Sequence, residues 1–264
     1  MTGVQTRALP IYTGTLDPMS TGVLPLALGR ATRLARFLSA SNKTYEATVL
    51  FGLTTDTLDV TGEQTSRTRA QVSRETLDRA LATLSGDYDQ VPPAYSAKKI
   101  AGRRAYDFAR NQEPVELRAV PVRVSAVEVQ AFDGERCRLT LTCSAGFYVR
   151  SFARDLGERC GPGACLEELR RTRSGEFRIE EAVPLEALET PETAATLVIP
   201  MGSLLKDFPW VSLSSEGLTR VAHGRSIRPV DVTAASPAPP APPALPALPA
   251  LPALPAPPAL PAPP

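Results

Sequence analysis

One carboxylate stands in an unusual place for a charged group. Asp17 lies between Leu16 and Pro18 in segment 14–29, which is rich in glycine and proline yet apolar. Such a segment predicts a buried, shaped loop, and loops of this kind carry function because their backbone polar groups are costly to bury. A desolvated aspartate needs a cationic partner, and arginine suits it best because it stays charged and binds both oxygens. The alternative is a structural aspartate that caps a helix or closes a turn, which composition alone favours.

Further candidates lie on predicted strands. Tyr45 projects from the apolar face of an alternating strand, where packing in the core is the simpler explanation. Tyr148 and Arg150 are two residues apart, which would place them on one face of a strand. Arg150 could therefore hold a carboxylate or form a surface pair. Three further arginines lie close together in the sequence, Arg170, Arg171 and Arg173. Their spacing indicates a phosphate-binding edge or a solvated face equally well.

Segment 95–110 combines positive charge with aromatic residues. It holds five basic side chains against one acid, Asp107, in a chain whose net charge is only +1. RNA-binding proteins use such charge for phosphates, and they use aromatic rings to stack on splayed bases. An exposed amphipathic helix is the alternative. The basic residues are Lys98, Lys99, Arg103, Arg104 and Arg110.

Composition excludes several classes of protein. The 29 basic and 28 acidic side chains nearly balance, so nucleic-acid contact must come from local patches. No apolar run approaches the ~20 residues of a membrane span, and the start lacks a secretory signal. Four cysteines without a CxxC pair, together with the single His223, argue against a zinc site. We expect a cytoplasmic protein with reduced thiols and no bound metal.

Both strands and helices are predicted to position these residues. Alternation predicts strands at 44–51, at 122–130 with a bulge near Ala126, and at 137–143. Helical spacing predicts helices at 31–38, at 77–84 with Ser73 as the N-cap, and after Arg150, and it places Leu166 and Leu169 on a helical turn. Strands outnumber helices, which favours an α+β domain with a mainly antiparallel sheet flanked by helices.

Six motifs occur in a fixed order along the chain: TGTLDPMSTGVLP at 13–25, KTY at 43–45, TDTLD at 55–59, QVPPAYSAK at 90–98, CSAGFYVR at 143–150 and LRR at 169–171. Together they resemble the bacterial tRNA pseudouridine synthases of the TruB family. The resemblance covers about residues 13–182 and continues weakly to 230. Each motif alone is weak, but six in order are specific.

The resemblance implies the pseudouridine synthase fold, followed by a small PUA-type RNA-binding domain. It also implies conversion of uridine-55 in the T-loop of tRNA to pseudouridine, without metal or organic cofactor. Asp17 would be the catalytic aspartate, Arg150 its partner, and Tyr45 a residue that packs on the target base and is a candidate for proton transfer. Tyr148 and Leu169 would line the pocket. Tyr12 stands where the family has a histidine near the flipped nucleotide, and the RNA-gripping insertion at 93–120 carries Lys98, Lys99, Arg103 and Arg104.

The physics of the reaction agrees with these roles. The uridine must leave its stack and enter a pocket before its glycosidic bond can be broken. One ionised carboxylate can then act as nucleophile or base. Whether Asp17 attacks the ribose, attacks the base or removes a ribose proton stays open.

The domains expected from the resemblance do not fill the chain. Residues 12–186 would form the catalytic domain, and 187–233 a linker with the truncated start of a PUA-like domain. Residues 1–11 lie outside the family pattern, and 234–264 form a low-complexity tail in which half of the 28 residues from Pro237 are proline. The tail is expected to be disordered or polyproline-like. These features support the hypothesis of an incomplete or chimaeric gene, whose product would act as a monomer.

Two rival functions remain. A non-catalytic RNA-binding or tRNA-folding protein, or an inactive fragment of the enzyme, could keep the same scaffold. Retention of Asp17, Tyr45 and Arg150 together argues for catalysis, because binding alone needs none of them. A carboxylate glycosidase also handles chemistry at C1′, but it would not need the basic insertion.

Overall fold

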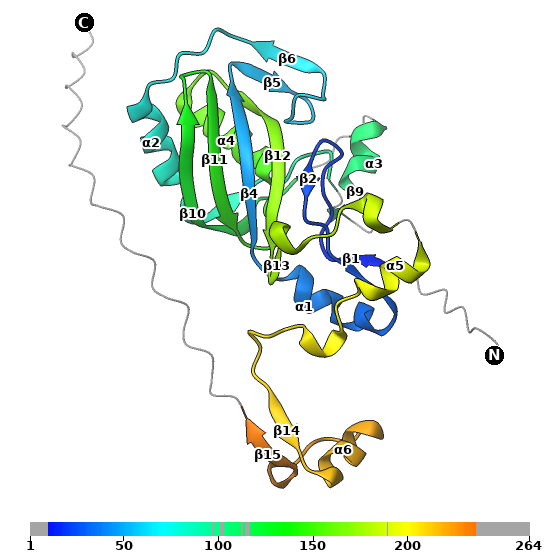
Figure 1. Cartoon of the computed structure of the whole chain (residues 1–264). Helices are drawn as coiled ribbons and strands as arrows, with labels where there is room; N and C mark the ends of the chain where they lie inside the picture. The colour runs from blue at the N-terminus through cyan, green and yellow to red at the C-terminus, as the bar shows by residue number, and fades with distance from the viewer. Residues whose placement is uncertain are drawn as a thin grey trace, which may run out of the picture. The chain divides into compact units, whose positions relative to one another are not determined.

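The central feature of the fold is a seven-stranded sheet. The computed structural model describes residues 10–96, 98–100, 103–111, 113, 117–188 and 190–235. The sheet has the order β13-β12-β4-β11-β10-β7, and the short strand β2 joins it by pairing in parallel with β12. All its other pairs are antiparallel (Figure 1). The predicted α+β class with a mixed, mainly antiparallel sheet is therefore confirmed.

The strands of this sheet are β2 (Thr21–Gly22), β4 (Lys43–Phe51), β7 (Gly86–Gln90), β10 (Val120–Phe132), β11 (Arg136–Cys143), β12 (Ala164–Ser174) and β13 (Phe177–Arg178). The helices are α1 (Ala35–Ser39), α2 (Arg74–Thr83), α3 (Ala105–Arg110), α4 (Val149–Cys160), α5 (Pro191–Thr196) and α6 (Ser215–Ala222). Four small two-stranded sheets complete the fold: β1 (Ile11–Tyr12) with β3 (Leu26–Ala27), β5 (Leu53–Thr55) with β6 (Gln64–Arg67), β8 (Lys99–Ile100) with β9 (Arg103–Arg104), and β14 (Val211–Leu213) with β15 (Val232–Ala235).

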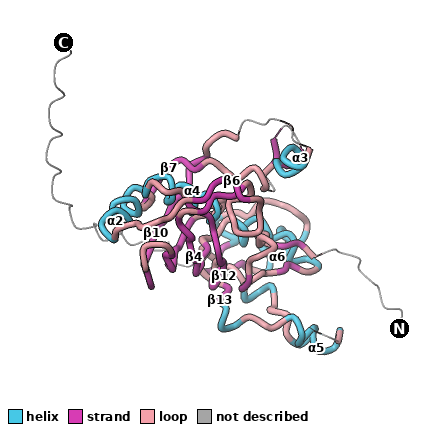
Figure 2. Tube along the Cα trace, turned by 90° about the horizontal axis from the view of Figure 1, so that it is seen from above, coloured by secondary structure: helices cyan, strands magenta, loops and turns pink. Residues whose placement is uncertain are grey.

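The core lies between the sheet and two helices. Helices α2 and α4 lie together against one face of the sheet (Figure 2). Apolar residues alternate along β4 and β11, and one set of them packs with Leu77 and Leu81 of α2 and with Phe152 and Leu156 of α4. On β4 the positions between them are polar at Thr44, Glu46 and Thr48, as the alternating pattern predicts for a strand with two different faces. Ser73 caps α2 by accepting from the backbone N–H of Thr76 at 3.2 Å, which confirms the predicted cap.

Two sequence predictions about local structure were wrong. Leu166 and Leu169 lie on strand β12, whose register shifts between Leu166 and Glu168. This irregularity adds one residue to the strand and turns a two-residue period into an apparent helical spacing. Arg150 does not share a strand face with Tyr148, because Tyr148 is the N-cap of α4 and Arg150 lies in its first turn. The bulge predicted near Ala126 is present, as a register shift between Val124 and Ala126.

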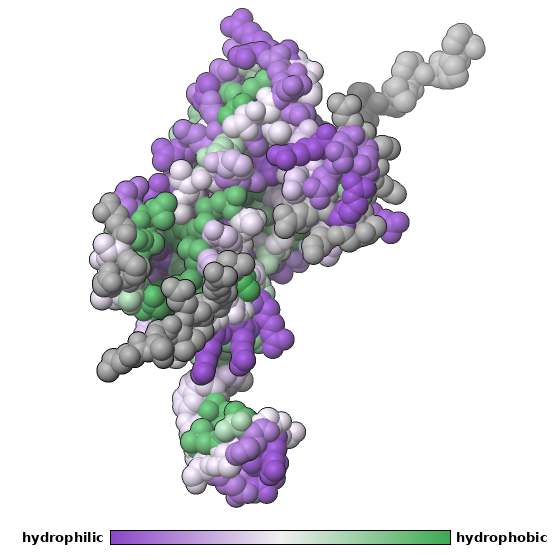
Figure 3. Space-filling model, turned by 90° about the vertical axis from the view of Figure 1, so that its right-hand side faces the viewer, coloured by the Kyte–Doolittle hydropathy of each residue, from purple (hydrophilic) through white to green (hydrophobic). Residues whose placement is uncertain are grey.

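The chain divides into two units, residues 1–206 and 207–264. The described part of the second unit contains β14, α6, a 3-10 helix at Pro229–Asp231 and β15, and several of its large apolar side chains are exposed (Figure 3). They include Trp210, Leu218, Val221 and Val230. The expected boundary after residue 186 and the PUA-like character of the second part stay predictions. The expected properties of residues 1–9 and of the tail at 236–264 fall outside the described residues.

Candidate functional site

An ion pair joins two residues that are 133 positions apart in the chain. Arg150 donates from Nε to Oδ2 of Asp17 and from Nη2 to Oδ1, each at 2.7 Å. The arginine side chain is 6% exposed, whereas that of the aspartate is 31% exposed. The guanidinium is therefore held inside the protein, and it presents a carboxylate that solvent or a ligand can still reach. A fork of two parallel bonds fixes the orientation of the carboxylate as well as its charge.

The remaining donors of Arg150 fix the guanidinium itself. Nη1 donates to the carbonyl oxygen of Thr57 and Nη2 to that of Tyr95, both at 2.9 Å. A second carboxylate, that of Asp59, lies 3.7 Å from Nε. Arg150 therefore meets segments that follow three different strands, and its position does not depend on Asp17 alone.

The turn that carries Asp59 is held by its own hydroxyl groups. Oδ1 of Asp59 accepts from Thr57 Oγ1 at 2.9 Å, from the backbone N–H of Thr61 at 3.0 Å, and from Thr61 Oγ1. Its backbone oxygen accepts from Thr55 Oγ1 at 2.6 Å. The aspartate is 5% exposed, and a buried carboxylate needs this number of donors to offset the loss of water.

The start of α4 is fixed by a buried amide. Gln90, which is fully buried at the end of β7, accepts from the backbone N–H of Tyr148 at 2.9 Å and donates to its carbonyl oxygen at 3.1 Å. Ser151 donates to the carbonyl oxygen of Val91 at 2.8 Å. The residues on either side of Arg150 are therefore anchored to the segment that follows β7.

Tyr45 is a buried aromatic residue on which the charge of Asp17 acts, and Leu169 lies on the neighbouring strand. Both belong to the hydrophobic core cluster, on adjacent strands β4 and β12. Burial raises the pKa of Tyr45, an effect that the neighbouring Arg171 guanidinium opposes and the charge of Asp17 adds to. Burial also raises the pKa of Tyr148. At neutral pH both phenols are therefore protonated, so they can donate a hydrogen bond but cannot act as bases.

The basic insertion is only partly described. Lys98 is half-buried, and the side chains of Lys99 and Arg104 fall outside the described residues. Arg103 pairs with Glu113 at 2.9 Å and lies over the ring of Phe108, 4.2 Å from its centroid. Among the described residues, no contact links the hairpin formed by β8 and β9 to Asp17. Its nearest connection to the ion pair is Tyr95, whose carbonyl oxygen accepts from Arg150.

Tyr12 lies on β1 and is 54% exposed. It stands two residues before Gly14, at the entrance of the loop that carries Asp17. The structure therefore brings Asp17 and Arg150 into contact, and the charge of Asp17 acts on the phenols of Tyr45 and Tyr148. Leu169 lies in the core on β12, and Tyr12 and the described basic residues of the insertion lie outside the ion-pair network.

Comparison with known proteins identifies the family. Residues 11–149 match the model of the TruB family pseudouridylate synthase N-terminal domain, and residues 150–206 match that of the tRNA pseudouridylate synthase B C-terminal domain. The chain belongs to the TruB family. It is therefore an isomerase, and the predicted resemblance is confirmed.

Two curated relatives of this TruB member carry the same name, tRNA pseudouridine synthase B. The protein called tRNA pseudouridine synthase B in Solibacter usitatus is 43% identical over 86% of this chain and 78% of its own length. The protein of the same name in Aromatoleum aromaticum is 42% identical over 81% of this chain and 70% of its own length.

Solved structures agree with the fold. A chain of a Cbf5-Nop10-Gar1 complex is 26% identical with a TM-score of 0.65, and a chain of an H/ACA RNP bound to a substrate RNA is 24% identical with a TM-score of 0.63. Each comparison covers 85% of this chain, which spans only about three fifths of each solved chain (61% and 60%).

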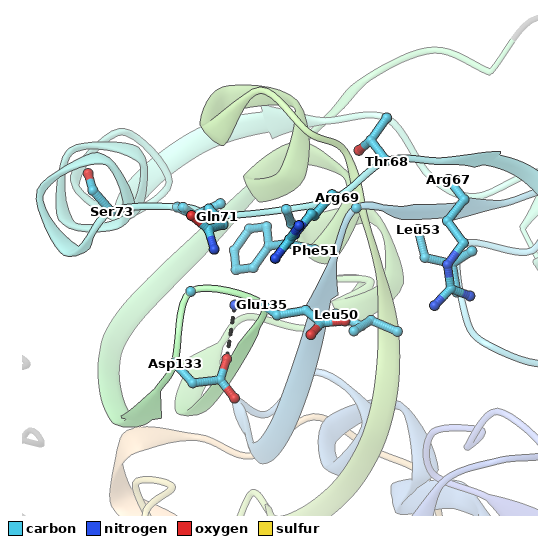
Figure 4. A pocket seen from close by; sticks show the side chains of 14 residues that line it. Leu50, Phe51, Leu53, Arg67, Thr68, Arg69, Gln71, Ser73, Asp133 and Glu135 are labelled. Carbon is cyan, nitrogen blue, oxygen red and sulfur yellow. Dashed lines mark hydrogen bonds between the residues drawn. The ribbon is translucent and has the colours of Figure 1, made fainter.

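A separate groove of about 900 Å³ lies at the other end of β4 from Tyr45 (Figure 4). Its lining includes Phe51, Arg69, Gln71, Asp133 and Glu135, and none of the residues predicted for the TruB site. Asp133 accepts from the backbone N–H of Glu135 at 2.9 Å and serves to close the β10–β11 hairpin. We therefore place the candidate site at the ion pair rather than in this groove.

Sequence reasoning did not assign to the site two residues that organise it, Asp59 and Gln90. Asp59 and Gln90 lie inside motifs that were recognised, so their place in those motifs was the available signal. Arg171 was expected at a phosphate-binding edge or on a solvated face, but it is 1% exposed and binds backbone carbonyls. Arg170 and Arg173 are exposed. Within the described residues, no helix is long and apolar enough to cross a membrane, and no cluster of acidic, cysteine or histidine side chains is arranged for a metal ion.

Proposed function

We propose that this chain converts uridine-55 in the T-loop of tRNA to pseudouridine, with Asp17 as the catalytic residue. The observation that carries the proposal is the two-bond contact between Asp17 and the buried Arg150. The substrate class is supported by the relatives, which are named tRNA pseudouridine synthase B and are 43% and 42% identical to this chain.

The reaction rearranges bonds without adding or removing atoms. The bond between C1′ and N1 breaks, a bond between C1′ and C5 forms, the proton on C5 leaves, and N1 gains a proton. The enzyme must therefore supply a group that assists the first bond cleavage and a path for one proton. It must also hold the freed base while the base turns, which requires a closed pocket and a base that has left its stack.

Asp17 meets the requirement for a single active carboxylate. Its contact with Arg150 stabilises the negative charge, and its exposed fraction of 31% leaves it accessible to a nucleotide. A carboxylate held in this way is available as a nucleophile or as a base without reorganisation at the moment of reaction. The guanidinium also donates to the backbone carbonyl oxygens of Thr57 and Tyr95. These two bonds keep it in place if the carboxylate of Asp17 moves toward the substrate.

Tyr45 and Leu169 suit the contact with the base. Both lie in the core on adjacent strands, the charge of Asp17 acts on Tyr45, and an aromatic ring is the side chain on which an everted base stacks. Because burial raises the pKa of Tyr45, its neutral phenol is a candidate for delivering a proton rather than for removing one. The basic hairpin with Lys98 and Arg103 would hold the RNA backbone around this pocket.

The test is the conversion of an unmodified tRNA transcript by the purified full chain. We expect pseudouridine at position 55 alone, mapped along the transcript, and none in a transcript with cytidine at position 55. Asp17→Asn should abolish the reaction while tRNA affinity stays within about twofold, because the amide keeps the shape of the carboxylate and loses its charge. The matched control is Asp78→Asn, which removes an exposed carboxylate paired with Arg74 on α2. Turnover by Asp17→Asn would remove Asp17 from the mechanism, and pseudouridine at another position would overturn the site specificity.

A further inference from the structure

Arg171 is a second buried arginine close to the site, and the mechanism above gives it no role. It is 1% exposed and is the largest of the fully buried side chains among the described residues. Among those residues it has no carboxylate within salt-bridge distance. A buried guanidinium with only neutral partners is costly, so its position requires a structural or functional explanation.

The partners of Arg171 are the backbone carbonyls of the loop that carries Asp17. Nη2 donates to the oxygen of Gly14 at 3.0 Å and Nη1 to that of Thr15 at 3.3 Å. Nε donates to the oxygen of Val23 at 2.7 Å. Gly14 and Thr15 precede Asp17 and Val23 follows it, so one rigid guanidinium ties together both arms of the loop.

The backbone of Arg171 holds the second arm as well. Its carbonyl oxygen accepts from the N–H of Val23 at 2.8 Å, and Arg171 is the register partner of Gly22 in the parallel β2–β12 pair. Within the loop, the N–H of Ser20 donates to the carbonyl oxygen of Asp17 at 2.9 Å, which closes a short turn around the aspartate. The loop is therefore fixed at its two arms by Arg171 and in its middle by its own turn.

We propose that Arg171 is a positioning residue for pseudouridine formation: it clamps both arms of loop 14–23 and so places Asp17 where Arg150 can hold it. The inference rests on the proposed role of Asp17. It deepens that role by separating the residue that holds the carboxylate, Arg150, from the residue that holds the loop.

The charge of Arg171 also acts on its surroundings. Burial lowers the pKa of Lys43, and the nearby Arg171 charge lowers it further. Lys43 donates to the carbonyl oxygens of Ser39 and Ser41 at 2.6 and 2.7 Å, so it too is committed to backbone. Both cations donate to neutral oxygen atoms, so they leave net positive potential beside the Asp17 loop, which favours a carboxylate there and phosphate groups of an incoming RNA.

The experiment compares Arg171→Met and Arg171→Lys with the wild-type chain. The control is Arg138→Met, which removes an exposed arginine from β11 of the same sheet. Single-turnover pseudouridine formation, tRNA affinity and hydrogen exchange of loop 14–23 are measured for each. We expect Arg171→Met to lower the rate about 100-fold with tRNA affinity unchanged, since small misplacement of a reacting group costs about this much. Its loop amides should exchange faster, and Arg138→Met should match the wild type in all three.

Chemical rescue separates positioning from general stability. Methylguanidinium added to Arg171→Ala should restore part of the rate, because it can occupy the vacated space and bind the same carbonyls. Wild-type rate or unchanged loop exchange in a folded Arg171→Met would overturn the proposal. If that variant does not fold, Arg171→Lys decides: a rate at least about tenfold below wild type in a folded protein supports the clamp. A wild-type rate, or failure of both variants to fold, would assign Arg171 to stability alone.

The failure of the proposed function would be visible separately. Absence of pseudouridine with the wild-type chain refutes that function. The exchange rates of loop 14–23 would still show whether Arg171 holds the loop.

Discussion

Asp59 places Oδ2 3.7 Å from Nε of Arg150, the same nitrogen that donates to Asp17 at 2.7 Å. The arginine therefore lies between two carboxylates, of which one is 7% and the other 31% exposed at the side chain. The buried aspartate is locked by the hydroxyls of its turn, whereas the accessible one is free of such bonds in the described contacts. One carboxylate thus lies buried behind the guanidinium, and the other is accessible to solvent.

Asp59→Asn should slow pseudouridine formation without weakening tRNA binding. The amide keeps the shape of the side chain but removes the charge that helps to hold Arg150 in place, so the guanidinium is fixed less firmly and orients Asp17 less well. The expected loss in single-turnover rate is about tenfold, which corresponds to one interaction with a charged group of about 1.5 kcal/mol. Asp78→Asn on the surface of α2 is the control. An unchanged rate with Asp59→Asn would show that the second carboxylate serves only the turn.

Arg150→Lys should lower the rate of pseudouridine formation strongly, even though the substitution keeps the positive charge. Lysine cannot bind both oxygens of Asp17 while also donating to the carbonyls of Thr57 and Tyr95. We expect a rate about 100-fold lower, equivalent to roughly 3 kcal/mol, with tRNA affinity retained. The control is Arg154→Lys, one turn along α4, whose arginine pairs with Asp155 at 2.6 Å. A rate within a few-fold of wild type would mean that charge alone, and not the fork, holds Asp17.

Buried thiols make the fold sensitive to alkaline pH. Burial raises the pKa of both Cys137 and Cys143 to about 12, while thiols in the unfolded chain titrate near about 8.5. Above the lower value the unfolded chain loses protons that the folded chain keeps, so the free energy of unfolding falls as pH rises. The contribution is complete below about pH 8.5 and is lost progressively toward pH 12.

The measurement is urea unfolding between pH 7 and pH 10.5. A variant with Cys137→Ala and Cys143→Ala should be less stable at pH 7, because two buried side chains are shortened, and its stability should fall less steeply with pH. Burial also raises the pKa of Tyr88, so part of the slope above pH 10 should remain. The same slope in both proteins would contradict the assignment of the alkaline sensitivity to these thiols.

The sequence was informative where a pattern is local. The cap at Ser73 and the apolar stripe of α2 follow from residues within one helix, and the alternation of β4 follows from its two different faces. The motif order indicated the family, and Arg150 was assigned to Asp17 by resemblance rather than by its immediate neighbours. That pairing is present in the structure.

The sequence predictions that were wrong concern residues whose positions depend on contacts between distant segments. Nothing near Arg171 in the sequence shows that its side chain reaches Val23, 148 positions earlier, instead of solvent. The spacing of Leu166 and Leu169 is equally ambiguous, because an irregular strand and a helix produce the same separation. The contact between Asp59 and Arg150 could be recognised only once the positions of the Asp59 turn and of the start of α4 were known.

Gly22 provides the sharpest test of the contact between loop 14–23 and the sheet. Its φ is +103°, and a Cβ at this position would lie 2.1 Å from the carbonyl oxygen of Arg171. Gly22→Ala must therefore separate β2 from β12 and disturb the bond between Val23 and Arg171. We expect a loss of about 2 kcal/mol in the free energy of unfolding and a lower rate of pseudouridine formation.

Gly202→Ala is the matched control, because its Cβ would meet no atom within 4 Å and its φ lies outside the left-handed region. It should leave both stability and rate unchanged. If Gly22→Ala destabilises the protein while the rate per folded molecule stays at the wild-type value, the close approach serves the sheet alone. A reduced rate in the folded fraction, measured below the melting temperature, means that the spacing between Gly22 and Arg171 helps to set the position of Asp17.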